Sequence, residues 1–88
     1  MNPKTIVATR EALGLTQAQL AQLVGVHVLT ISKWERDVLT PSPHQSALLE
    51  AFARAAEREP EAGITAVHLL ATKGVAAALH SLLDDAME

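Results

Sequence analysis

The side chains that could do chemistry in this sequence are hydrogen-bond donors rather than catalytic groups. The 88 residues include no cysteine, and the four histidines lack the spacing of a metal site such as HExxH. No nucleophile is paired with a base, no glycine-rich loop could hold a phosphate, and acidic residues cluster only in the C-terminal tail. We therefore expect no enzyme, no metal ion and no cofactor.

Ser32 and Lys33 are adjacent side chains that can donate hydrogen bonds. Val28 and Leu29, shortly before them, are apolar and cannot form hydrogen bonds through their side chains. This chemistry requires a helix that turns these side chains outward.

The surrounding segment, GLTQAQLAQLVGVHVLTISKWER, favours two short helices joined by a tight turn. Leu20 and Leu23 fall on one face of the first helix, and Gly25 is typical of its end. In the second helix Ile31 and Trp34 share an inward face at a spacing of three residues. Two helices joined by three to four residues with a glycine are a helix-turn-helix motif.

Capping signals divide the rest of the chain into further helices. Asn2 and Pro3 predict a helix start, and Gly14 predicts the end of that helix. The pairs Thr16 with Gln19 and Ser42 with Gln45 are spaced as capping boxes. The buried stripe of the helix that follows Ser42 consists of Leu48, Leu49 and Phe52.

Glu59-Pro60-Glu61 breaks the chain before a last, apolar segment. We expect two helices there, near 64–72 and 75–86, separated by Gly74. A short strand over residues 63–67 is the alternative, because isoleucine, threonine and valine favour strands.

Composition and charge are consistent with one small helical protein. Apolar residues make up 49% of the chain and are mostly alanine, leucine and valine, which favours an all-helical fold. Residues 1–58 hold six basic and five acidic residues, a net charge of +1, whereas residues 59–88 hold one basic and five acidic residues, a net charge of −4. The first part is thus available to an anionic partner. No apolar run approaches a membrane span and no signal peptide is apparent, so we expect a cytoplasmic protein.

The sequence resembles the phage-repressor (Cro/repressor, XRE-type) helix-turn-helix family over residues 3 to about 56. The matching residues are Arg10, Leu13-Gly14-Leu15-Thr16-Gln17, Leu20-Ala21, Gly25-Val26, Thr30-Ile31-Ser32, Trp34-Glu35-Arg36 and Pro41-Ser42. The resemblance implies an all-α, lambda-repressor-like helix-turn-helix domain of four to five short helices at residues 1–58. Residues 59–88 then form a C-terminal helical extension.

The resemblance also implies a sequence-specific regulator that binds double-stranded DNA, most simply a repressor of a palindromic operator. Its recognition helix runs from about Val28 to Arg36, with base-reading positions at Val28, Leu29, Ser32 and Lys33. Gln17 corresponds to a glutamine that contacts a phosphate and braces this helix. Arg36 and the loop through Thr40 lie where the family approaches the DNA backbone. The DNA-binding residues expected together are Gln17, His27, Val28, Leu29, Thr30, Ser32, Lys33, Arg36 and Thr40.

Some of these positions depart from the family pattern. Val28 and Leu29 replace polar readers, so we expect thymine methyl contact combined with one guanine; alternatively, either residue belongs to the core. Thr30 could be partly buried. His27 replaces the serine or threonine expected as helix cap, which puts the tightness of that cap in doubt and could place a protonatable group near a phosphate. By the same resemblance, Arg10 and Glu35 form a structural salt bridge between the first and third helices.

The apolar side chains of the C-terminal extension must be buried, either against a partner or against the domain itself. Its stripe of Val75, Leu79, Leu82 and Leu83 could pack back on the chain, but we expect it to form a homodimer that presents two recognition helices to a palindrome. Two other functions stay open. One is an antitoxin-type autorepressor whose acidic C-terminal segment also binds a toxin protein, and the other is a protein-interaction module that has lost DNA binding.

Overall fold

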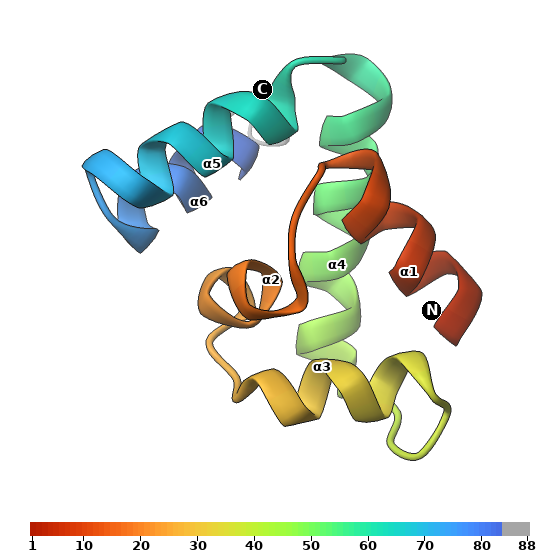
Figure 1. Cartoon of the computed structure of the whole chain (residues 1–88). Helices are drawn as coiled ribbons and strands as arrows, with labels where there is room; N and C mark the ends of the chain where they lie inside the picture. Colours follow the sequence, from red (N-terminus) through yellow and green to blue (C-terminus); the bar gives the residue numbers. More distant parts are fainter. Residues whose placement is uncertain (84–88) are drawn as a thin grey trace.

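The computed structural model describes residues 1–83, which form six α-helices (Figure 1). They are α1 (Pro3–Ala12), α2 (Gln17–Val24), α3 (Val28–Glu35), α4 (Pro43–Arg58), α5 (Ala62–Thr72) and α6 (Val75–Leu83). The described residues contain no strand, so the all-α prediction is confirmed and the alternative strand at 63–67 is wrong. Residues 84–86 of the last expected helix, and the acidic residues Asp84, Asp85 and Glu88, lie outside the described part.

Local capping chemistry starts the helices where the sequence indicates. The Asn2 side chain accepts a hydrogen bond from the backbone N–H of Thr5 at the start of α1 (2.8 Å). The Thr16–Gln19 and Ser42–Gln45 pairs both form complete capping boxes, at α2 and α4 respectively. Each box satisfies two backbone N–H groups that the first helical turn would leave without partners.

A single left-handed glycine makes the turn between α2 and α3. Gly25 has a φ of 81°, and its N–H and that of Val26 both donate to the carbonyl of Ala21, at 2.8 and 3.0 Å. This compact ending leaves only three residues between the two helices. The short turn fixes the direction in which α3 leaves α2.

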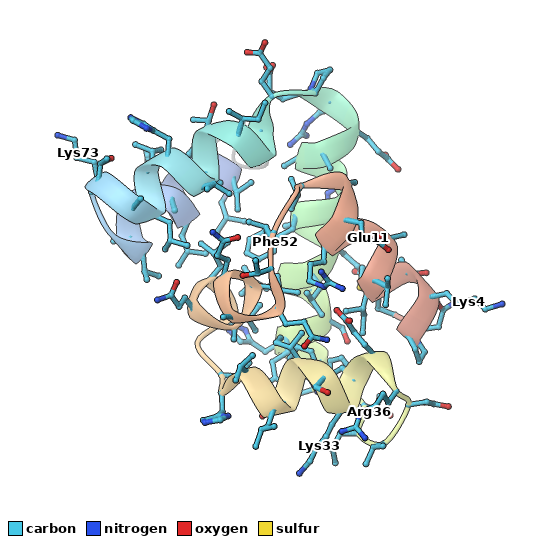
Figure 2. All side chains as sticks on the ribbon, in the orientation of Figure 1. Lys4, Glu11, Lys33, Arg36, Phe52 and Lys73 are labelled. Carbon is cyan, nitrogen blue, oxygen red and sulfur yellow. The ribbon has the colours of Figure 1, made fainter. Side chains whose placement is uncertain are left out.

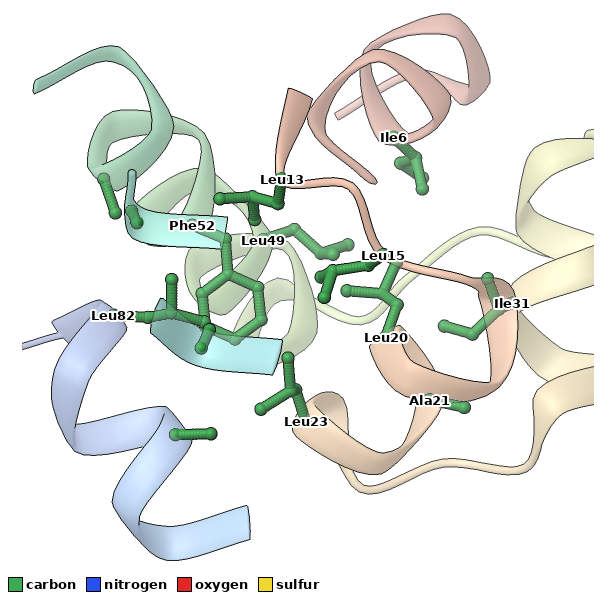
Figure 3. Packing of buried hydrophobic residues seen from close by; sticks show 14 of the residues in the cluster. Ile6, Leu13, Leu15, Leu20, Ala21, Leu23, Ile31, Leu49, Phe52 and Leu82 are labelled. Atoms are coloured by element: carbon green, nitrogen blue, oxygen red, sulfur yellow. The ribbon is translucent and has the colours of Figure 1, made fainter. Parts of the chain in front are cut away.

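The hydrophobic core is one cluster to which all six helices contribute (Figure 3). Its largest fully buried side chains are Trp34, Phe52, Ile6, Leu20, Leu23, Ile31, Leu49 and Leu82. The predicted core role of Trp34 is thus confirmed. Leu82 of α6 lies beside Phe52 of α4 in Figure 3, so the core is continuous across residue 58.

Helix α5 packs unusually close to the loop between α1 and α2. Gly63, in the first turn of α5, is buried, and a β-carbon built on it would overlap the carbonyl oxygen of Leu13. The neighbouring positions on this face, Ala62 and Ala66, are also buried. Small residues therefore allow α5 to lie against the loop between α1 and α2.

The position of α6 corrects the predicted dimerisation stripe. Leu82 is 1% exposed and packs within its own chain, so it cannot face a partner as predicted. Leu79 and Leu83 are half-buried against the same core, while Val75 stays exposed. An apolar stripe with this spacing can pack against another copy of the chain or against the chain's own core. Leu82 packs against its own core.

Candidate nucleic-acid interface

Helix α3 is anchored by one face and exposed on the other. Ile31 and Trp34 are buried in the core, at 0% and 2% exposure. Leu29 is 58% exposed and Lys33, one turn further along, is also exposed. Figure 1 shows α3 at the end of the molecule opposite α5 and α6, and Figure 2 shows Lys33 projecting from it away from the other helices. The outward face is therefore open along its length.

The structure places the predicted DNA-binding residues as follows. Val28 and Leu29 are both exposed, which excludes the alternative that either residue belongs to the core. Thr30 and Ser32 are half-buried, and Thr40 is exposed in the loop after α3. Gln17 is half-buried at the start of α2, where its side chain bonds to Glu35 near the end of α3.

A side-chain hydrogen bond orders the C-terminal end of this face. Arg36 Nε donates to Ser32 Oγ at 3.2 Å, one helical turn away. The serine oxygen accepts in this contact, so its own proton is free to be donated outward. The guanidinium keeps its remaining N–H groups, which suit a phosphate oxygen.

His27 caps α3, although histidine is not the residue expected at a helix cap. Its Nδ1 accepts a hydrogen bond from the backbone N–H of Leu29 at 3.1 Å. Serine or threonine oxygens usually fill this role, but an unprotonated imidazole nitrogen can also accept. The bond requires the ring proton of the neutral form to be on Nε2, and a fully protonated ring would lose the cap.

Behind α3, Arg10 and Glu35 form the ion pair expected between the first and third helices. Arg10 Nε and Nη2 donate to the two carboxylate oxygens of Glu35 at 2.6 and 3.1 Å. Arg10 Nη1 donates to the carbonyl of Leu15 at 3.1 Å, and Gln17 Nε2 donates to Glu35 Oε1 at 2.9 Å. We call these four residues the Arg10 cluster. It joins α1, the following loop, α2 and α3, and within it Gln17 braces α3 through Glu35.

Electrostatics favour the charged form of both partners. Burial raises the pKa of Glu35, but the hydrogen bonds from Arg10 and Gln17 and the charge of Arg10 outweigh it, so that the pKa lies below 4.5. The hydrogen bond to Glu35 raises the pKa of Arg10 further above its usual value. The pair is thus ionised at neutral pH.

We expect the stability of the protein to decrease as the pH falls below the ordinary glutamate value of 4.5. Since the pKa of Glu35 is lower in the folded protein than in the unfolded chain, its contribution is complete above that pH and is lost as the pH falls through the folded-state pKa. Urea unfolding between about pH 7 and pH 3 measures this dependence. Glu35→Gln should lose less stability over that range than the wild type; equal losses would contradict the assignment to Glu35.

Two exposed apolar residues beside α3 were not predicted from the sequence. Val38 and Leu39, in the loop after α3, are 58% and 47% exposed. The backbone N–H of Val38 donates to the carbonyl of Lys33 at 2.8 Å, and Asp37 adopts a left-handed φ of 61°. Two adjacent apolar residues inside a loop were the available signal, but a loop residue can equally turn inward.

Within residues 1–83, no group of three or more His, Cys, Asp or Glu side chains could hold a metal ion. Nor is any helix in that range long and apolar enough to span a membrane.

Comparison with known proteins gave one match. The model of a family described as helix-turn-helix matches residues 6–53, which extend from α1 into α4 and include the whole of α2 and α3. No curated protein and no solved structure matches the chain.

Proposed function

Since the chain belongs to the helix-turn-helix family of the XRE type and is a DNA-binding transcription regulator, we propose that it is a repressor that binds a palindromic operator as a dimer. The observation that carries the proposal is the division of α3 into a buried face and an open face. The open face bears Leu29, Lys33 and Arg36. A repressor of this kind acts by occupying the DNA that the transcription machinery requires.

The outward face of α3 has the chemistry of a major-groove reader. In our proposal Lys33 donates to the O6 and N7 atoms of a guanine, and Ser32 donates to a neighbouring base or phosphate. Arg36, Thr40 and Gln17 approach the phosphates at either end of the helix. His27 Nε2 carries a proton, because Nδ1 accepts from Leu29, and is a further donor for a phosphate.

Selection of bound duplexes from random DNA, followed by the variant Lys33→Ala, tests this function. We expect the variant to lose about 1–3 kcal/mol of discrimination at one base pair, because a single base contact disappears. Binding titrations on duplexes altered at that pair measure the loss. Lys73→Ala is the matched control, since it removes the same charge from the opposite end of the molecule (Figure 2). Equal weakening on all duplexes would make Lys33 a phosphate contact instead.

The outer face of α5 supports the dimer. Ile64 is 73% exposed there, with Thr65 and His68 also exposed, and no charged residue occurs between Ala62 and Thr72. A two-fold interface brings a surface against itself, so an uncharged apolar face avoids repulsion between identical copies. In Figure 1 α5 lies away from α3, and pairing through α5 would leave both recognition helices free. Val75, at the start of α6, is a second large apolar residue exposed at this end.

Ile64→Glu is expected to convert the dimer to monomers, because the substitution would set two carboxylates against each other in an apolar contact. Sedimentation at tens of micromolar protein measures the assembly. Operator affinity should fall in parallel, since each subunit alone supplies few phosphate contacts. Gln22→Glu adds a charge on exposed α2 and should leave the assembly unchanged. A wild-type protein that sediments only as a monomer would refute the dimer.

A further inference from the structure

Exposed apolar side chains are concentrated where this protein would touch DNA. The large hydrophobic residues that are exposed within the described chain number six, and four of them lie on α3 or in the loop after it. Those four are Val28, Leu29, Val38 and Leu39. Phosphates attract cations, so an apolar surface at this place contributes little to general DNA affinity. The two of these residues that lie on α3, Val28 and Leu29, could instead fit an apolar feature of the groove.

The first turn of α3 holds its two apolar residues in a fixed position. The Leu29 N–H is capped by His27 Nδ1 at 3.1 Å, and the Thr30 N–H donates to the His27 carbonyl at 2.9 Å. Behind this turn, Ile31 is fully buried and anchors the helix. Leu29 and Val28 are therefore presented outward by a first turn in which the N–H groups of Leu29 and Thr30 have partners.

The major groove offers one apolar group to such side chains, the methyl group on C5 of a pyrimidine. Thymine carries it, and so does 5-methylcytosine, while uracil and cytosine lack it. Lys33 lies four residues after Leu29 on the same helical face, so an apolar contact and a cation are one turn apart. A C5-methylated pyrimidine next to a guanine presents the matching pair, a methyl group beside two acceptors.

We propose that the first turn of α3 recognises the C5-methyl group of a pyrimidine next to the guanine bound by Lys33. Operator affinity then depends on whether that methyl group is present, whether thymine or 5-methylcytosine supplies it. This inference rests on the proposed function, because it assumes that the outward face of α3 enters the major groove.

Base analogues test the proposal on the selected operator. Replacing thymine by uracil removes only the methyl group, and at the contacted position we expect affinity to fall about fourfold per half-site. In duplexes with a cytosine–guanine pair at that position, replacing cytosine by 5-methylcytosine should raise affinity by a similar factor. A response to thymine alone would restrict the proposal to thymine and overturn the 5-methylcytosine arm. Changes of less than twofold at every position, with both analogues, would overturn it entirely.

Variants then assign the effect to a side chain. Leu29→Ala should make duplexes with and without the methyl group bind equally, and it replaces an exposed residue by a better helix former, so the fold is kept. Circular dichroism checks the helix content. Leu39→Ala is the matched control, because it removes an exposed leucine from the loop rather than from α3. It should preserve the full ratio between the two duplexes; loss of the ratio in this variant and not in Leu29→Ala would refute the assignment.

The proposed function and the methyl contact would be refuted by different results. If selection yields no preferred duplex, the proposed function is wrong and this inference falls with it. If an operator is selected and Lys33→Ala alters its discrimination, but methyl removal has no effect, only the inference is wrong.

Discussion

Arg10→Ala is expected to lower the free energy of unfolding by about 3 kcal/mol, because it leaves the buried carboxylate of Glu35 without its cationic partner. The Glu35 side chain is 8% exposed, and Arg10 provides two of the three hydrogen bonds that it accepts. The carbonyl of Leu15 loses its side-chain donor as well. Urea unfolding, monitored by the fluorescence of Trp34, measures the loss.

Three further variants show whether the unpaired charge is the cause. Arg10→Lys should recover little, since an ammonium group cannot reproduce the two-pronged contact. The double variant Arg10→Leu with Glu35→Leu should recover most of the stability, because no buried charge is then left alone. Lys4→Ala, an exposed cation on the same helix, is the control. If Arg10→Ala is no less stable than Lys4→Ala, the Arg10 cluster does not stabilise the fold.

Gly63→Ala is expected to destabilise the protein by about 2 kcal/mol, although alanine is the better helix former. The gain in helix propensity is about 1 kcal/mol. Against it stands the overlap of the new methyl group with the backbone of Leu13, which cannot rotate away as a flexible side chain could. Overpacking of this kind costs about 3 kcal/mol at the upper end of its usual range. Urea unfolding and the slope of the transition measure the net effect.

Thr65→Ala is the matched control for that substitution. It lies in the same helix, is exposed and gains helix propensity without a clash, so we expect it to be slightly more stable than the wild type. If Gly63→Ala behaved like Thr65→Ala, α5 would not be held against the loop between α1 and α2. A loss in Gly63→Ala alone identifies the close approach as the cause.

Features fixed by neighbours in the sequence were predictable, and features fixed by distant neighbours were not. The capping boxes at Thr16 and Ser42 and the glycine turn at Gly25 are short-range chemistry, so the helix boundaries follow from a few residues. The outward position of Leu29 and Lys33 followed from helical spacing once Ile31 and Trp34 were assigned inward. These signals predicted α2, the turn and α3 in full.

The rejected alternative of a strand at 63–67 and the wrong assignment of Leu82 have physical reasons of their own. Ile64, Thr65 and Val67 favour a strand, but Ala62, Gly63 and Ala66 make a narrow helical face that fits the loop at Leu13, and packing decides the conformation. Leu82 was assigned to a partner because an apolar stripe does not reveal what covers it. The bracing role of Gln17 came from the resemblance alone, because its bond to Glu35 joins residues 18 positions apart and no local pattern indicates it.

The shared core also constrains how the molecule is made. Leu82 and Ala78 of α6 belong to the same core cluster as Phe52, and the ribosome synthesises them after α1 to α4. A nascent chain that has reached α4 therefore has its entire recognition helix but an open hydrophobic centre. We therefore expect a product truncated before α6 to be less stable than the whole chain and more readily cleaved by proteases.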